Sequence, residues 1–122
     1  MMIKLNRYLR ELGIDEKNFY FSKGENNDPR YVPDEDTGIP SSHTWAMDGA
    51  LAMIIYTYLR TFKDTKRCAY PARLTEEKWE SILDEMIKGF ASIIKEEESH
   101  NARKRQRKAL MLFKNYFYDL GW

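Results

Sequence analysis

Positively charged side chains have the clearest chemistry in this sequence, and they gather in two stretches. Residues 60–73 contain five of them, and residues 103–108 contain five more. Arginine offers a planar fork of donors and lysine a compact charge, and both groups bind phosphate. Aromatic side chains close to them in the sequence could stack on the base of a nucleotide. The pattern predicts a site for a small anionic ligand such as a cyclic nucleotide, formed by Trp45, Arg60, Lys63, Arg67, Tyr70, Arg73, Arg103, Arg105 and Arg107.

The acidic run at residues 96–98 offers a second interpretation of the same charges. Runs of charge usually face solvent, and these three glutamates stand close enough in the sequence to neutralise the basic stretch that follows. The whole chain has 20 basic and 19 acidic residues and a net charge of +1, which argues against a partner as large as a long nucleic acid. A ligand site and a solvated charged face both stay open.

The sequence lacks the motifs of common catalytic and metal sites. It has no glycine-rich phosphate loop, no CxxC and no HExxH. Glu97-x-x-His100 has the spacing of one ligand pair in a di-iron helical bundle, but the second pair and the inward-facing glutamates that such a site needs are missing. Ser41, Ser42 and His43 are adjacent, although a nucleophile needs a base and an orienting group brought to it in space. We therefore expect no enzyme activity, no cofactor and no metal.

Thr44 to Phe62 is the stretch that we expect to hold the charged residues in place. Between Trp45 and Leu59 its only charge is Asp48, so a helix formed from it is apolar on nearly every side. The run is shorter than the ~20 apolar residues that cross a membrane. It therefore predicts the buried central helix of a bundle, ending near residue 64, and no membrane partner.

Asp48 needs a reason to stand in an apolar helix. An unpaired carboxylate in a core is costly, so we expect a hydrogen bond from Arg60, Arg73, Trp45 or a tyrosine hydroxyl. A recognition carboxylate at the floor of a pocket is the alternative interpretation.

Three further helices are predicted around this one. Residues 2–12 form a short helix that stops at Gly13. Thr75 opens a helix with a continuous apolar stripe from Trp79 to Ile94, which should lie on the central helix. The polar residues near Ser99 favour a break before a last helix, although one continuous helix stays open. At the start of the central helix, capping is expected from Ser41, Ser42 or Thr44.

The loop-rich arm at residues 14–40 contains three of the four prolines and is anchored by bulky aromatics. We therefore divide the chain into residues 1–40, with the N-terminal helix and the arm, and a helical core domain at residues 41–122. The lone Cys68 cannot form an intrachain disulfide, and the N-terminus has no apolar export segment. Both features favour a reducing cytoplasm.

A string of positions across residues 43–122 completes the sequence signals. Its members are His43, Trp45, Asp48, Leu59, Phe62, Lys63, Tyr70, Pro71, Trp79, Ile82, Leu83, Asp84, Met86, Ile87, Phe90, Leu112, Phe113, Tyr116, Phe117 and Leu120. The string resembles a family of small proteins of no known activity encoded by tailed bacteriophages. The resemblance implies a phage origin and expression in the cytoplasm of a bacterial host. Small phage proteins without catalytic motifs commonly inhibit host factors or sequester nucleotide signals of antiviral defence, and the second role implies a homo-oligomer with pockets between protomers.

Taken together, the sequence predicts an all-α fold, a compact helical bundle of three main helices around a buried central helix, with a short N-terminal helix and a loop-rich arm. The predicted function is that of a non-catalytic phage accessory protein, in an anti-defence role, that sequesters a small anionic ligand such as a cyclic nucleotide. The alternative is a protein-interaction module that inhibits or adapts a host protein through its arm and helical faces.

Overall fold

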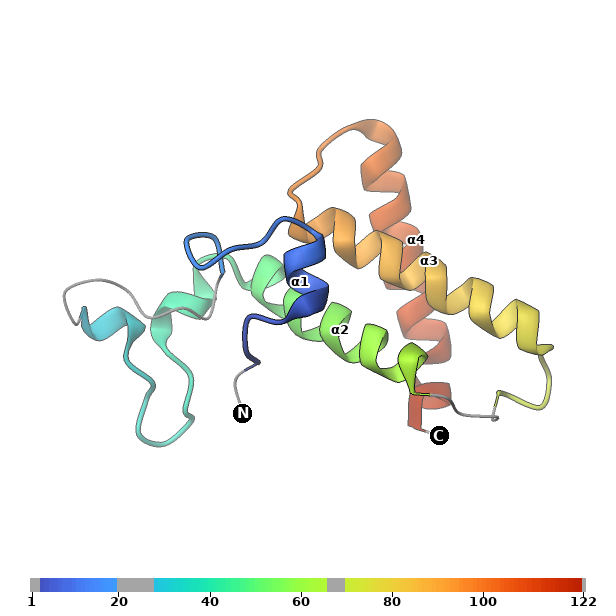
Figure 1. The fold of residues 1–122 in the computed structure, drawn as a ribbon, viewed down its shortest axis with the longest axis horizontal. Helices are drawn as coiled ribbons and strands as arrows, with labels where there is room; N and C mark the ends of the chain where they lie inside the picture. The colour runs from blue at the N-terminus through green and yellow to red at the C-terminus, as the bar shows by residue number, and fades with distance from the viewer. Residues whose placement is uncertain (1–2, 20–27, 66–69, 122) are drawn as a thin grey trace.

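Helices make up all the regular secondary structure in the part of the chain that the structure describes. The structure is a computed structural model that describes residues 3–19, 28–65 and 70–121. The predicted all-α bundle of three main helices with a short N-terminal helix is confirmed. In chain order the elements are α1 (Arg7–Glu11), η2 (Pro29–Tyr31), η3 (Ser41–Thr44), α2 (Met47–Asp64), α3 (Glu76–Ile94), α4 (His100–Tyr116) and η4 (Phe117–Gly121) (Figure 1).

The central helix of the bundle is α3. It packs against both α2 and α4, which make no comparable contact with each other, and α4 crosses it steeply (Figure 1). The prediction that Thr44 to Phe62 is the enclosed centre is therefore wrong, because Leu51 and Tyr58 of α2 are 47% and 57% exposed. The apolar residues of α2 thus lie on two faces of the helix. One face packs against α3, and the other is exposed.

Small residues bring α3 and α4 very close together. A Cβ atom added at Gly89 of α3 would lie 2.1 Å from the Cβ of Ala109 and 2.9 Å from the carbonyl oxygen of Arg105. Beside this contact the rings of Phe90 and Phe113 meet edge to face at 5.6 Å. The close approach fixes α4 on α3, and with it the basic side chains that α4 carries.

A tight connection separates α3 from α4, in agreement with the predicted break. Ser99 caps α4 by accepting a hydrogen bond of 3.1 Å from the backbone N–H of Ala102. The buried Gln106 amide donates to Ser92 Oγ at 3.0 Å and to the carbonyl oxygen of Glu97 at 2.9 Å. Because both donors of the amide are satisfied, Gln106 holds the connection against the ends of both helices.

Capping side chains mark the starts of α1, α3 and α4, but not the start of α2. α1 begins at Arg7, later than the predicted residue 2, because the Asn6 side chain accepts hydrogen bonds from the backbone N–H groups of Tyr8 and Leu9. Gly13 ends this helix as predicted, at φ 86°. The predicted capping of α2 is wrong: residues 41–44 form η3 instead, and Ala46 at the cap position has no capping side chain.

Residues 28–46 extend away from the three main helices (Figure 1). They overlap only the second half of the predicted arm, and we use the name arm for residues 28–46 of the structure. The arm elements η2 and η3 pack on each other, and η3 also contacts the start of α2. The earlier part of the predicted loop behaves differently, because Ile14 and Phe19 are buried in the core.

None of the helices in the described residues combines the length and the apolar character that a membrane span requires.

Candidate functional site

The structure does not assemble the nine residues predicted as one ligand site. Arg60 of α2 donates to Glu11 Oε2 at 3.1 Å and to the Tyr56 hydroxyl at 2.8 Å, and its guanidinium lies 4.5 Å from the ring centre of Tyr8. It therefore fastens α1 to α2, and its donors are directed into the protein.

Two further predicted cations also join elements of the fold. Lys63 of α2 pairs with Asp84 of α3. Arg73 donates to both carboxylate oxygens of Asp119, at 3.1 and 2.6 Å, and its guanidinium lies 5.6 Å from the ring centre of Tyr116. These cations already have anionic partners, which is why they do not converge on a common cavity.

The aromatic members of the predicted site lie elsewhere. Trp45 meets the ring of Tyr31 edge to face at 6.0 Å and carries the Arg30 guanidinium at 5.0 Å from its ring centre, so it belongs to the arm. Tyr70 is exposed on the segment before α3. Arg67 lies outside the described residues.

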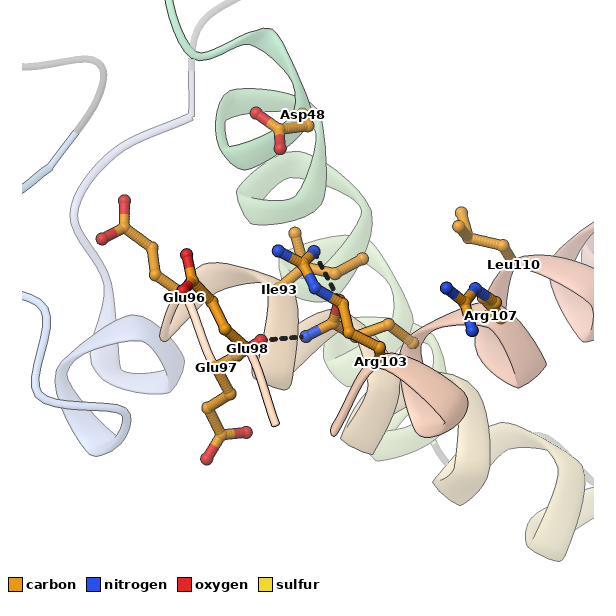
Figure 2. A pocket seen from close by; sticks show the side chains of 9 residues that line it. Asp48, Ile93, Glu96, Glu97, Glu98, Arg103, Arg107 and Leu110 are labelled. Carbon is orange, nitrogen blue, oxygen red and sulfur yellow. Dashed lines mark hydrogen bonds between the residues drawn. The ribbon is translucent and has the colours of Figure 1, made fainter. Parts of the chain in front are cut away.

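Helical geometry separates the three predicted arginines of α4. Arg103 and Arg107 are four residues apart and share one flank, whereas Arg105 points to the other flank. Arg103 and Arg107 line a cavity of about 630 Å³, the loop pocket, together with Asp48, Ile93, Glu96, Glu97, Glu98, Gln106 and Leu110 (Figure 2). Four carboxylates against two guanidiniums make the loop pocket a poor site for an anion.

Asp48 lies in the first turn of α2 and lines the loop pocket (Figure 2). None of its predicted partners reaches it: within the described residues its carboxylate makes no ion pair and no hydrogen bond, and the residue is exposed. The prediction of a buried, paired carboxylate is therefore wrong. A negative charge in the first turn of a helix is favourable, so the residue does not need a partner for stability.

Arg105 lines a different hollow, the basic cleft, on the opposite flank of α4. The cleft has a volume of about 300 Å³ and is lined by Glu85, Lys88, Asn101, Lys104, Arg105 and Lys108. Lys108 pairs with Glu85 at 2.9 Å. The cleft thus carries four cations and one carboxylate, which is the strongest concentration of positive charge on any described cavity.

A third feature is apolar, and sequence reasoning missed it. The apolar groove has a volume of about 440 Å³ and is lined by Ile54, Ile55, Tyr58, Leu59, Thr61 and Phe62 of α2, by Thr65 just after it, and by Phe113 and Leu120. Apolar residues on every side of α2 are the sequence signal for it, but the same pattern also predicts complete burial. Likewise, Lys88 of α3 was not connected with Lys104 and Lys108, because their proximity depends on how α3 crosses α4.

No comparison supplies a relative for this chain: family models, curated proteins and solved structures gave no match. The resemblance to a phage family stays a prediction. Among the described residues, no group of three histidine, cysteine, aspartate or glutamate side chains could hold a metal ion.

Proposed function

We propose that this protein binds a small phosphate-bearing anion in the basic cleft and releases it chemically unchanged. The observation that carries the proposal is the gathering of Lys88, Lys104, Arg105 and Lys108 around one hollow of about 300 Å³. The proposal keeps the anionic ligand expected from the sequence and moves its site. Of the nine predicted residues, it retains only Arg105.

The charges of the cleft are not balanced by the protein itself. Glu85 forms an ion pair with Lys108. Within the described residues, Lys88, Lys104 and Arg105 have no ion pair. Lys104 and Lys108 are four residues apart on α4, and like charges at that spacing destabilise a helix by about 0.2–0.5 kcal/mol. A bound anion would remove this repulsion, which favours binding of a multiply charged ligand.

The lining of the cleft also indicates which anion fits. Ligand pockets span about 300–1,000 Å³, so this cleft stands at the small end of the range. Among the described residues, no aromatic side chain lines it, so these residues offer the base of a cyclic nucleotide nothing to stack on. Four cations and the Asn101 amide suit a diphosphate or triphosphate group, in which oxygens are abundant and charge is dense.

Calorimetric titration of the full chain with pyrophosphate and with triphosphate tests the proposal, with sulfate at matched ionic strength as reference. We expect saturable binding of the phosphates that weakens about tenfold or more in Lys88→Gln with Lys104→Gln, since each lost charge-assisted contact is worth about 1.5–3 kcal/mol. Recovery of the ligand after heating should return it intact. A hydrolysed ligand would indicate an enzyme instead.

A matched control separates a site from general attraction. Arg103→Gln with Lys114→Gln removes the same charge from α4 outside the cleft. This variant should bind as tightly as the unaltered chain. Equal weakening in both double variants, or no binding by the unaltered chain, would contradict the proposal.

The exposed apolar side chains of the arm favour a second candidate function, a protein-interaction module. Val32, Ile39 and Trp45 expose more than half of their surface on a segment that extends from the core (Figure 1). Exposed apolar side chains on a projecting segment are typical of interaction sites. Val32→Ser with Ile39→Ser should abolish capture of a bacterial protein in a pull-down experiment, whereas the Lys88 and Lys104 variant should retain it.

A further inference from the structure

Exposed apolar residues stand one helical turn from residues that line the apolar groove, on both sides of it. Leu51 extends the groove along α2, while Leu110 and Phe117 extend it along α4 and η4, and we call the groove with these three residues the apolar face. Each of these three side chains is about half exposed, at 47%, 51% and 51%. Scattered exposed apolar residues are normal on a protein, but exposed apolar residues that adjoin an apolar groove are typical of an interaction site.

The two helices contribute to this face in the same order. Asp48 shares the loop pocket with Arg107 and Leu110, and farther along, Ile54 and Ile55 share the apolar groove with Phe113. Phe62 and Thr65 then lie opposite Leu120. The start of α2 therefore shares a cavity with the first half of α4, and the end of α2 shares one with Phe113 and η4, so the face has a charged end at the loop pocket and an apolar end at η4.

We infer that this face binds a second copy of the chain, related by a two-fold axis that runs along the groove. Such an axis lays α2 of one copy over α4 of the other in the same direction and at the same height. It places Leu51 and Ile55 against Leu110 and Phe113 of the other copy. The same patch serves both partners, as an isologous interface requires.

Two symmetry-related opposite-charge pairs favour this particular axis, although the loop pocket as a whole has more carboxylates than guanidiniums. The rotation brings Asp48 of each copy toward Arg107 of the other, so two opposite-charge pairs form at the charged end. Within the described residues, neither Asp48 nor Arg107 has an ion pair in its own chain, and both line the loop pocket (Figure 2). An axis that laid α2 on α2 would instead leave each carboxylate without a cation opposite it.

The size of the face agrees with a modest dimer. An aromatic side chain has roughly 150–250 Å² to bury, so half-exposed Tyr58 and Phe117 supply about 100 Å² each. With Leu51, Leu110 and the groove walls, each copy has roughly 500–600 Å² to bury, near the lower limit of stable interfaces. The inference is independent of the phosphate proposal, because the basic cleft lies on the other flank of α4.

Sedimentation of the full chain at micromolar concentrations tests the dimer and its axis together. The unaltered protein should sediment at about twice its 14.6 kDa mass. Asp48→Arg and Arg107→Asp should each weaken the dimer about tenfold to a hundredfold, because each places like charges in contact twice. The double variant with both reversals should restore the dimer, since the pairs are then exchanged.

Glu80→Arg is the control, because it reverses an exposed charge on α3 away from this face. It should leave the dimer intact. A monomer at these concentrations would overturn the inference, as would single reversals that leave the dimer unchanged or a double reversal that fails to restore it.

Discussion

The two faces of α2 differ in what covers them, although both are apolar. The face toward α3 and α1 contains Ala52, Met53 and Tyr56, which are almost completely buried. The other face contains Leu51 and Tyr58, which are about half exposed, and Tyr58 lines the apolar groove. The apolar composition of α2 therefore reflects both of its faces, including one that the rest of the described chain does not cover.

This difference teaches how an apolar helix should be interpreted in a short chain. A helix without a polar face can be the centre of its own fold, or it can lie at the side of the fold and serve two neighbours. In this protein the amphipathic α3 is central, because α2 and α4 pack on it from different directions. The helix with the clearest single stripe is the one that the other two share.

Substitutions on the two faces of α2 should have very different effects on folding. Met53→Ala removes a completely buried side chain and should lower the free energy of unfolding by about 2–5 kcal/mol. Leu51→Ala should change it by about 0.5 kcal/mol or less. Urea denaturation at low protein concentration, where self-association does not contribute, measures both. Equal losses would mean that the two faces are equally buried.

The contact between α3 and α4 should be the least tolerant of added volume. In Gly89→Ala, the new methyl group would lie 2.1 Å from the Cβ of Ala109. We expect a net loss of about 1–2 kcal/mol, because overpacking outweighs the better helix propensity of alanine. The double variant with Ala109→Gly should lose less than the sum of the single variants. Additive losses would contradict the close approach.

Arg73 tests whether a cation of the predicted ligand site is structural. Its pair with Asp119 is largely exposed on the arginine side, so Arg73→Gln should lower the free energy of unfolding by about 0.2–1 kcal/mol. The affinity for pyrophosphate should not change. A marked loss of affinity with an unchanged melting temperature would return Arg73 to the ligand site.

The pH dependence of His43 should be the smallest effect. Burial lowers the pKa of this imidazole below its usual 6.5, so the unfolded chain binds the proton more readily than the folded one. Stability should therefore fall as the pH drops below about 6.5, and His43→Gln should reduce that loss. Melting temperatures of both proteins between about pH 7.5 and 5 measure it, and identical slopes would contradict the burial of His43.

Local signals predicted the helices of this fold well. Gly13, Thr75 and Ser99 act through hydrogen bonds or backbone angles within a few residues, so their roles follow from sequence. Asn6 was missed because the apolar repeat before it suggested an earlier start. The central position of α3 depends on packing between distant residues, which apolar content alone does not report.

The candidate sites were harder to predict, for a related reason. Cations adjacent in the sequence were assumed to act together, yet Arg103 and Arg105 occupy opposite flanks of one helix. Arg60 pairs with Glu11 and Arg73 pairs with Asp119, so neither arginine contributes to a shared cavity. The basic cleft combines α3 with α4, and only their crossing brings Lys88 beside residues 104–108.

Light scattering of Tyr58→Asp during size-exclusion chromatography tests most directly that the outer face of α2 is an interface and not a core. A charge there should leave the fold intact and separate the copies. We expect a compact monomer of 14.6 kDa. An expanded or aggregated chain would show that Tyr58 belongs to the core, and a compact dimer would show that this face does not join the two copies.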